Sequence, residues 1–592
     1  MKKTALLIFI VMLSLFSLVS AQTFNDYVLA FKGDTAVIKD FTDKGNVAST
    51  LTSAVNLDTI NVPAGRVYML SANGYYPLAA NLTTPTTRPV TIVGADFTRL
   101  VNNKNINSAP PLICGSTIQG AGSNTGSITW QNNLTIKNVN IIPAASDGTL
   151  GWAFIGDGAP NKRVTLDNCL FERTRWVIVQ SNNDAGTSLF ITDCYFVNLI
   201  GQACRRNGGV YDNVNNDSDT IWVENTTHVV AQGSMYKFRN FPLKKAFFNH
   251  NTFIDCAGST FESLGYLSNL TVTNNIFVNS NIQPFSNTVG IADVGETDAD
   301  TLPTGLVNCR ALPAAMTQLD RKILVDRNVA YWDSVKLYPM ITYCNTNKVN
   351  SDQTWTSQMI TMNKRTQAMF NDDKTYPYLT EGKWYKKLPA FANPQNLLTA
   401  EADSVKAFAQ KTVDLNSTNI LGDWRLVNKG SAFFVYSDWP IPVDLSYTDA
   451  DLMTGGTNGF PIGDLNWFPA KKTLWNAQKD AEHTALQNVL NTGKLTDVRQ
   501  EANIPTGFAL DQNYPNPFNP STMISFSLPH SAYASLKVFD MLGREVATLV
   551  NGFTAAGSHE VQFNATNLAS GVYLYKLTSG DFTQTMKMML VK

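Results

Sequence analysis

"VTLDNCLF" (residues 164–171) and "LFITDCYF" (residues 189–196) are two copies of an eight-residue motif that recurs through the middle of the chain. The other copies are "LTIKNVNI" from Leu134, "IWVENTTH" from Ile221, "AFFNHNTF" from Ala246, "LTVTNNIF" from Leu270 and "ILVDRNVA" from Ile323. Successive copies start 30, 25, 32, 25, 24 and 53 residues apart, so the last interval holds either two periods or one coil with a long insertion. "VTIVGADF" from Val90 would be an eighth, degenerate copy. A repeat of this length predicts a solenoid whose coils contact their neighbours.

Each position of the motif has its own chemistry. Positions one and three are apolar in every copy, which is the pattern of a strand with one buried face. Position eight is mostly large and apolar, as at Phe171 and Phe196. Position five is polar; its members include Asn138, Asn168, Asp193, Asn225, His250 and Asn274. Asn adopts the left-handed conformation that a sharp corner needs, and its amide can bond the equivalent side chain one coil away.

A strand, an Asn corner and a second short strand at this period predict an all-β right-handed parallel β-helix. The alternative is a β-sandwich with coincidental spacing, although sandwich strands would not repeat Asn at one register. In this repeat and its Asn column, residues 85–335 resemble the pectate-lyase-like family of parallel β-helix proteins. The resemblance implies the fold, but no lyase, polygalacturonase or pectin-esterase motif accompanies it, so it implies no particular reaction.

The two ends of the chain differ from this middle part. Residues 1–21 combine Lys2 and Lys3, an apolar core and a small-residue site at Val19-Ser20-Ala21, which predicts a secretory signal peptide. Residues 22–84 are expected to cap the first coil. Residues 336–503 are expected to form a C-terminal cap or a flap along the solenoid, with helical patterns at 396–410 and 473–490. No later stretch is apolar and long enough to predict a transmembrane segment.

The pattern of the last part of the chain, residues 504–592, predicts a separate small β-sandwich. Short alternating segments such as "MISFSL" from Met523 and "GVYLYKL" from Gly571 are separated by Gly-containing turns about ten residues apart. The preceding "DQNYPNPFNPST" (residues 511–522) contains three prolines, so neither a helix nor a central strand can run through it.

This segment resembles the type A C-terminal sorting domain of the type IX secretion system. The matching stretches are "LDQNYPNPFNPSTMISFSLP", "LKVFDMLGREVATLVNG", "NATNLASGVYLYKL" and the terminal "KMMLVK". The resemblance implies that the type IX machinery is a partner and that the Asn-Pro stretch is a stiff entrance to an export domain. It also implies a Gram-negative protein that is secreted or attached to the outer-membrane surface.

Composition excludes some classes of function. The 46 basic and 47 acidic residues include no basic block, so the chain has no electrostatic footprint for nucleic acid. The seven cysteines are an odd number with no metal-ligand spacing. Cys169 and Cys194 share position six on adjacent coils, where stacked thiols are expected rather than a disulfide.

Candidate catalytic residues come from the outward-facing positions and the loops. Asp167 and Glu224 occupy position four two coils apart, about 9.6 Å at the usual strand spacing, which is near the carboxylate separation of an inverting glycosidase. Arg205 and Arg206 are candidates for the base of a polysaccharide lyase, which would also use Ca²⁺ to neutralise a uronate carboxylate. Solvated surface charge is the alternative for all four. No cofactor or metal site is identified, and the acidic, Gly-rich stretch 448–464 is expected to be an ordinary loop.

A candidate carbohydrate-binding strip comes from position two, where three successive coils carry Phe190, Trp222 and Phe247. Aromatic rings beside polar groups hold the apolar faces of sugars, but the 336–503 segment could equally pack over them. We therefore expect a secreted or surface-displayed β-helix protein that contacts extracellular polysaccharide. The alternatives are an active lyase or glycoside hydrolase on this scaffold, or a structural or adhesive surface protein.

Overall fold

The computed structural model describes residues 22–97, 109–118, 122–182, 184–201, 207–214, 216–238, 243–263, 268–286, 305–309, 312, 316–348, 351–395, 397, 439, 441–495, 507–528, 532–554, 557–580 and 582–592. The expected signal peptide lies outside these residues, as do Arg205, Arg206 and nearly all of the helical pattern at 396–410. The chain divides into two compact units, residues 1–494 and 495–592. Each is described by itself.

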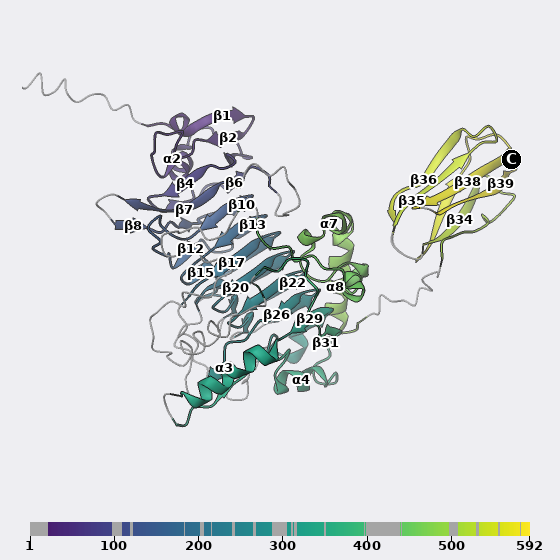
Figure 1. Ribbon diagram of the computed structural model, residues 1–592. Helices are drawn as coiled ribbons and strands as arrows, with labels where there is room; N and C mark the ends of the chain where they lie inside the picture. Colours follow the sequence, from purple (N-terminus) through teal and green to yellow (C-terminus); the bar gives the residue numbers. More distant parts are fainter. Residues whose placement is uncertain are drawn as a thin grey trace, which may run out of the picture. The chain divides into compact units, whose positions relative to one another are not determined.

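The first unit is a solenoid with three sheets, which confirms the predicted parallel β-helix (Figure 1). Sheet A has twelve strands, which are in spatial order β1 (Val28–Lys32), β2 (Thr35–Ile38), β3 (Val67–Leu70), β6 (Val90–Gly94), β10 (Leu134–Lys137), β13 (Arg163–Asp167), β16 (Thr187–Thr192), β19 (Ser218–Glu224), β22 (Leu243–Asn249), β25 (Asn269–Thr273), β28 (Lys322–Asp326) and β31 (Leu379–Glu381). From β2 onward every neighbouring pair is parallel, so each coil adds one strand to the edge left by the coil before it.

Sheets B and C complete each coil. Sheet B contains β4 (Tyr75–Leu78), β7 (Leu112–Ile118), β11 (Asn140–Ile142), β14 (Leu170–Glu172), β17 (Tyr195–Leu199), β20 (Thr227–Ala231), β23 (Thr252–Cys256), β26 (Ile276–Val278), β29 (Asn328–Tyr331) and β32 (Trp384–Tyr385), with β8 (Gly122–Asn124) beside β7. Sheet C contains β5 (Leu82–Thr83), β9 (Ile128–Thr129), β12 (Ala153–Gly156), β15 (Val177–Gln180), β18 (Gly209–Asp212), β21 (Tyr236–Phe238) and β24 (Phe261–Ser263). A separate antiparallel pair joins β27 (Phe285–Ser286) to β30 (Trp355–Thr356).

The strand register reproduces the motif alignment. Leu134 pairs with Val164, and the same position pairs onward through each copy to Ile323. Val90 pairs with Leu134, which confirms the degenerate eighth copy. Because β25 pairs directly with β28, the interval of 53 residues is one coil with a long insertion. Parallel pairing at this register excludes the β-sandwich alternative for the solenoid.

The position-five residues form the predicted corner. Asn138, Asn168, Asp193, Asn225, His250, Asn274 and Arg327 all have φ between 48° and 58°. The Asn168 amide donates to the Asn138 side chain over 2.9 Å, so the expected bond between equivalent residues forms between these two coils. At Arg327 a long side chain occupies the left-handed conformation, which costs free energy that Asn largely avoids.

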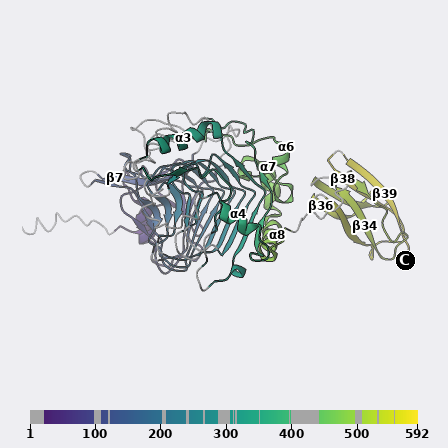
Figure 2. The same cartoon turned by 90° about the horizontal axis from the view of Figure 1, so that it is seen from below.

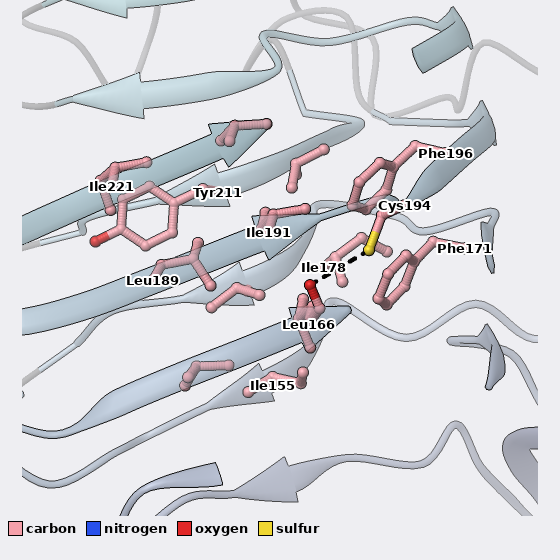
Figure 3. Packing of buried hydrophobic residues seen from close by; sticks show 14 of the residues in the cluster. Ile155, Leu166, Phe171, Ile178, Leu189, Ile191, Cys194, Phe196, Tyr211 and Ile221 are labelled. Carbon is pink, nitrogen blue, oxygen red and sulfur yellow. Dashed lines mark hydrogen bonds between the residues drawn. The ribbon is translucent and has the colours of Figure 1, made fainter. Parts of the chain in front are cut away.

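One apolar core runs the length of the solenoid. Leu166, Ile191 and Val272 are fully buried in it, and Figure 3 shows Leu166 and Ile191 with Ile178 and Phe171 in the interior. The position-eight rings stack on one another at centroid distances of 4.6 Å from Phe171 to Phe196, 5.0 Å from Phe196 to His228, 4.3 Å from His228 to Phe253 and 5.2 Å from Phe253 to Phe277. Position eight of the motif therefore corresponds to a continuous stack of rings in the core.

Position six points inward and forms a polar ladder that the sequence interpretation missed. Asn251 donates through Nδ2 to Oδ1 of Asn275 over 3.0 Å, and Asn275 donates to Asn328 over 3.0 Å. All three side chains are fully buried. Cys169 and Cys194 hold this position earlier in the solenoid as free thiols, as expected, and Cys194 Sγ contacts the carbonyl of Leu166 (Figure 3).

Helices cover the ends of the core. Helices η1 (Phe24–Tyr27) and α2 (Thr50–Leu57) lie at the N-terminal end, where Leu51, Ala54 and Val55 of α2 join the core. Strands β3, β4 and β5, within the residues expected to cap, already pair in parallel with the next coil. At the other end lie η4 (Gln318–Asp320) and α4 (Lys364–Phe370), and Phe370 joins the core there. Helix α3 (Ser334–Thr346) packs instead in a separate apolar cluster with Ala257 and Ile282.

After β32 the chain returns along the solenoid. Its elements are α6 (Ala450–Met453), η5 (Thr457–Gly459), η6 (Leu465–Trp467), α7 (Pro469–Asn476) and α8 (Lys479–Thr492). Residues 441–468 bury Ile441, Val443 and Trp467 against the outward side chains of sheet B. Helices α7 and α8 run beside the solenoid (Figures 1 and 2), and α8 packs on sheet A. The helical pattern at 473–490 is two helices, because α7 ends at Asn476 and α8 begins at Lys479.

The second unit is the predicted β-sandwich. One sheet contains β33 (Ala509–Leu510), β34 (Ser521–Leu528) and β37 (Gly557–Asn564); the other contains β35 (Ala532–Phe539), β36 (Glu545–Thr554), β38 (Gly571–Ser579) and β39 (Phe582–Leu590). The Asn-Pro stretch is more than an entrance, since Phe518 is buried in the sandwich core. The backbone N–H of Phe518 donates to Met589, and the N–H of Val591 donates back to Phe518. The stretch thus fastens the C-terminal strand.

Candidate functional site

The outward side chains of sheet A come from even positions of the motif, and α8 divides them into two parts. On β22, β25 and β28 the residues Phe247, Thr271 and Leu324 are buried. Leu486, Val489 and Leu490 of α8 form one apolar cluster with Phe247 and Leu324. On β10, β13 and β16 the corresponding residues Thr135, Thr165 and Phe190 are half-buried. We call the outward side chains of β10, β13 and β16 the open face.

The predicted aromatic strip exists as a stack of rings. The Phe190 and Trp222 centroids are 6.2 Å apart with planes 20° from parallel, and Trp222 and Phe247 are 3.8 Å apart at 19°. Rings stacked in this way turn their faces toward one another and their edges outward. His483 of α8 meets Trp222 edge-on at 4.9 Å. Phe190 is therefore the ring that ends the stack on the open face, and carbohydrate binding by the strip stays a prediction.

Basic side chains lie over this stack. The Arg163 guanidinium is 4.5 Å from the Phe190 centroid, and the Lys245 ammonium is 5.0 Å from that of Trp222. Both contacts have cation–π geometry. The acidic residues nearby are engaged by other lysines: Asp167 lies 2.9 Å from Lys137, and Asp219 lies 3.3 Å from Lys244. The positive groups that face the rings are therefore Arg163 and Lys245, whereas the nearby carboxylates are paired with other lysines.

The two candidate carboxylates lie in different surroundings. Asp167 and Glu224 each pair with Thr192 in the intervening strand, which confirms that they stand two coils apart. Asp167 is half-buried on the open face and accepts a hydrogen bond of 2.8 Å from Thr192. Glu224 is 4% exposed because α8 covers it. A catalytic role for this pair stays a prediction.

Glu224 is bound by a histidine of α8. His483 Nε2 lies 2.8 Å from Glu224 Oε1, and Asn249 donates to the same oxygen over 2.8 Å. Burial opposes the charged imidazolium, but the hydrogen bond and the negative charge of Glu224 outweigh burial and raise the pKa of His483. The pair therefore holds α8 against sheet A at the border of the open face.

A second carboxylate–histidine pair lies behind the first. Glu482 of α8 is fully buried, and its Oε1 lies 3.1 Å from His250 Nε2 and accepts from Asn249 over 2.9 Å. Its other oxygen accepts from Trp475 over 3.0 Å. Burial alone would raise the pKa of Glu482, but the charge and hydrogen bond of His250, together with the other donors, lower it. Asn249 bridges Glu482 to Glu224, so one network joins both pairs.

The sequence interpretation did not find Glu482 and His483. They lie more than 230 positions from their partners, and a helical run contains no sign of which strand it will cover. One residue of the repeat did indicate a distant partner. His250 replaces Asn at position five, and a buried imidazole needs a hydrogen-bond partner that the repeat itself does not supply.

His228 and the stretch 448–464 take part in the packing and hydrogen bonding of the fold. His228 lies inside the ring stack with Nε2 2.9 Å from the Tyr236 hydroxyl, and burial lowers its pKa to about 3. Residues 448–464 contain α6 and η5, and Asp464 accepts from Thr227 over 2.7 Å. Within the described ranges, no three His, Cys, Asp or Glu side chains gather closely enough to hold a metal ion. Among the same residues no helix has the length and apolar character needed to cross a membrane.

Comparisons with solved structures return two remote similarities. One is to a chain from work on PorZ, an essential surface component of the type-IX secretion system of Porphyromonas gingivalis; identity is 22%, the match covers 17% of this chain and 13% of that chain, and the TM-score is 0.11. The other is to PfbA, a surface adhesin of Streptococcus pneumoniae, at 12% identity over 53% of this chain and 84% of that chain, with a TM-score of 0.18. Both scores are too low to carry an argument about function. No curated protein matches the chain.

The C-terminal unit is the part that a family model matches. Residues 512–592 match the secretion system C-terminal sorting domain, in agreement with the resemblance of the Asn-Pro stretch and the strands that follow it. This domain indicates export by the type IX secretion system. The chain therefore carries a type IX sorting domain and is a secreted or cell-surface protein with a β-helix as its main body.

Proposed function

We propose that the exported solenoid binds an acidic extracellular polysaccharide on its open face. The observation that carries this proposal is the pairing of Phe190 with Arg163, an aromatic ring and a guanidinium on strands that α8 leaves uncovered. A uronate sugar presents apolar C–H groups that can lie against the outward edge of an aromatic ring, and a carboxylate that a guanidinium binds.

The surroundings of this pair suit a repeating ligand. Thr135 and Thr165 offer hydroxyls from successive strands, which lie about 4.8 Å apart. Lys245 over Trp222 adds a second positive charge along the same direction. A flat row of hydroxyls with cations favours an extended anionic chain over a compact ligand.

Affinity electrophoresis of the full chain in gels containing polygalacturonate tests the proposal. Phe190→Ala and Arg163→Gln should each weaken retardation about tenfold, because each removes roughly 1–2 kcal/mol of contact. Leu29→Ala, an exposed apolar residue on β1 of the same sheet, and Arg544→Gln in the sorting domain are the matched controls and should leave retardation unchanged.

Three results would contradict the proposal. They are equal retardation in a neutral glucan gel, retardation that survives both open-face substitutions, and equal losses in the controls. A steady rise in absorbance from unsaturated sugar ends, measured with Ca²⁺ present, would replace binding by lyase activity as the function. Salt dependence gives a further check, because binding through cations weakens as ionic strength rises.

A further inference from the structure

A buried lysine, asparagine and aspartate lie together on sheet C, away from the open face. Asp212 ends β18, and Lys237 of β21 is its partner in the parallel register. Asn207 precedes β18. The exposed fractions are 1% for Lys237, 3% for Asn207 and 0% for Asp212. Lysine is almost never buried to this extent without polar partners, so the contacts of its amine indicate what it does there.

The three functional groups are in contact. Lys237 Nζ lies 3.3 Å from Asn207 Oδ1 and 3.9 Å from Asp212 Oδ2. Trp176 Nε1 donates to Asp212 Oδ2 over 3.0 Å, which fixes the carboxylate beside the amine. The backbone N–H of Gly208 donates to the carbonyl of Trp176 over 2.8 Å and so holds the segment that carries Asn207. The carbon of the Asn207 amide is one bond beyond the oxygen that the amine already contacts.

This group of side chains contains what an acyl transfer needs. The Lys237 amine is a nucleophile once it has lost its extra proton, and Asp212 lies close enough to take that proton. Such a transfer turns an ion pair into two neutral groups, and a dehydrated space penalises neutral groups less than charges. The same burial excludes water, which would otherwise compete with the amine for the amide carbon.

We propose that Lys237 and Asn207 join in an intramolecular amide bond. The neutral Nζ attacks Cγ of Asn207, while Asp212 donates a proton to Oδ1. Asp212 then carries a proton from Nζ to Nδ2, the Cγ–Nδ2 bond breaks, and Oδ1 returns its proton to Asp212 as the carbonyl forms again. One Nζ–Cγ bond replaces one Cγ–Nδ2 bond, and one molecule of ammonia leaves. No electrons are gained or lost, so the reaction needs no oxidant and no cofactor.

Mass spectrometry of the denatured full chain tests the proposal. The wild-type mass should be lower than the mass calculated from its sequence by about 17 Da, because one ammonia is lost. A tryptic digest should contain one branched peptide that joins the segments of Asn207 and Lys237, since trypsin does not cleave after an acylated lysine. Lys237→Arg keeps the charge and the donors but has no reactive amine, so the branched peptide should be lost. Lys244→Arg, at a lysine of β22 whose side chain is 65% exposed, is the matched control and should keep it.

The peptide map decides between this bond and other losses of ammonia, such as cyclisation of an N-terminal Gln. Separate linear peptides carrying Asn207 and Lys237 in the wild type would overturn the proposal, as would a mass loss that persists in Lys237→Arg. Asp212→Asn keeps the shape of the side chain but cannot carry the proton, so most of that variant should remain linear; complete cross-linking would contradict the role of Asp212. Because either variant could fail to fold, the wild-type map alone is enough to reject the bond.

Discussion

Replacing Glu482 by Gln should release α8 from sheet A. The carboxylate is fully buried and lies among donors: Oε1 faces Asn249 and His250, and Oε2 faces Trp475. A Gln amide has one oxygen and one NH₂ group, so its NH₂ group must face a group that is itself a donor, either Asn249 or Trp475. Trp475 Nε1 can only donate, and the Asn249 amide is fixed because its oxygen accepts from Thr273 and Asn274.

The size of the effect follows from the burial. Removing one partner of a buried charged pair costs about 3–5 kcal/mol when the other partner is left unpaired. The Gln side chain keeps one acceptor oxygen for the surrounding donors, so we expect the lower limit, about 3 kcal/mol. If the cost falls on local opening of α8, the equilibrium for opening rises about 100-fold.

Hydrogen exchange of the backbone amides measures this opening directly. Peptides that cover residues 479–492 should exchange about 100-fold faster in Glu482→Gln, whereas peptides from β13 and β16 should be unchanged. Asp480→Asn is the matched control, because Asp480 is exposed in the first turn of the same helix. Its loss removes a favourable interaction with the helix dipole, about 0.3–1 kcal/mol, and a minor charge effect on His483. Exchange in Glu482→Gln that stays within about threefold of this control would refute the donor-conflict argument.

Three further predictions concern the same unit. The raised pKa of His483 means that its contribution to α8 docking is complete below the unfolded value of about 6.5 and is lost as pH rises through the folded pKa. The lowered pKa of Glu482 means that its contribution is present above about pH 4.5 and is lost as pH falls through the folded pKa. Protection of the α8 amides from hydrogen exchange should therefore decline on both sides of a maximum near about pH 5–6. A profile that does not change with pH would contradict the direction of both pKa shifts. Arg327→Asn should raise the urea midpoint, because Asn tolerates φ of 56° and the gain is about 0.5–1 kcal/mol. The ion pair that is lost is partly buried, but Asp326 keeps the backbone N–H of Lys383 as a donor; an unchanged or lower midpoint would contradict the prediction. Asn275→Ala should cost about 3 kcal/mol in urea unfolding because buried donors of Asn251 lose their acceptor, whereas Cys194→Ala at the same register should cost less, and equal losses would show that the ladder adds nothing.

The sequence predicted those features that depend on local conformation and on the repeat. The apolar residues at positions one and three had to share a face, and Asn at position five had to turn a corner, because both follow from backbone sterics within a few residues. The register from Val90 to Ile323 follows from aligning those signals. The ring stack and the Asn168–Asn138 bond are consequences of that register, since they join residues one coil apart.

Other features could not be predicted because each needs information from two distant segments. The position-six ladder was missed since its first members are Val139 and Cys169, which carry no amide, so the column shows no single chemistry. The aromatic strip was expected at the right positions. Whether Phe247 would be covered, however, depends on Leu486 and Val489, which are more than 230 residues away.

The position of α8 is set by polar complementarity as much as by apolar contact. An apolar helix face could slide along sheet A by one strand, since Phe247, Thr271 and Leu324 form a continuous surface. A slide of one strand would separate Glu482 from His250 and His483 from Glu224 at the same time, leaving four titratable groups without their partners in a dehydrated interface. That cost holds the helix to one register on the solenoid. The same register leaves Phe190 and Arg163 uncovered, so the buried network determines where the open face begins.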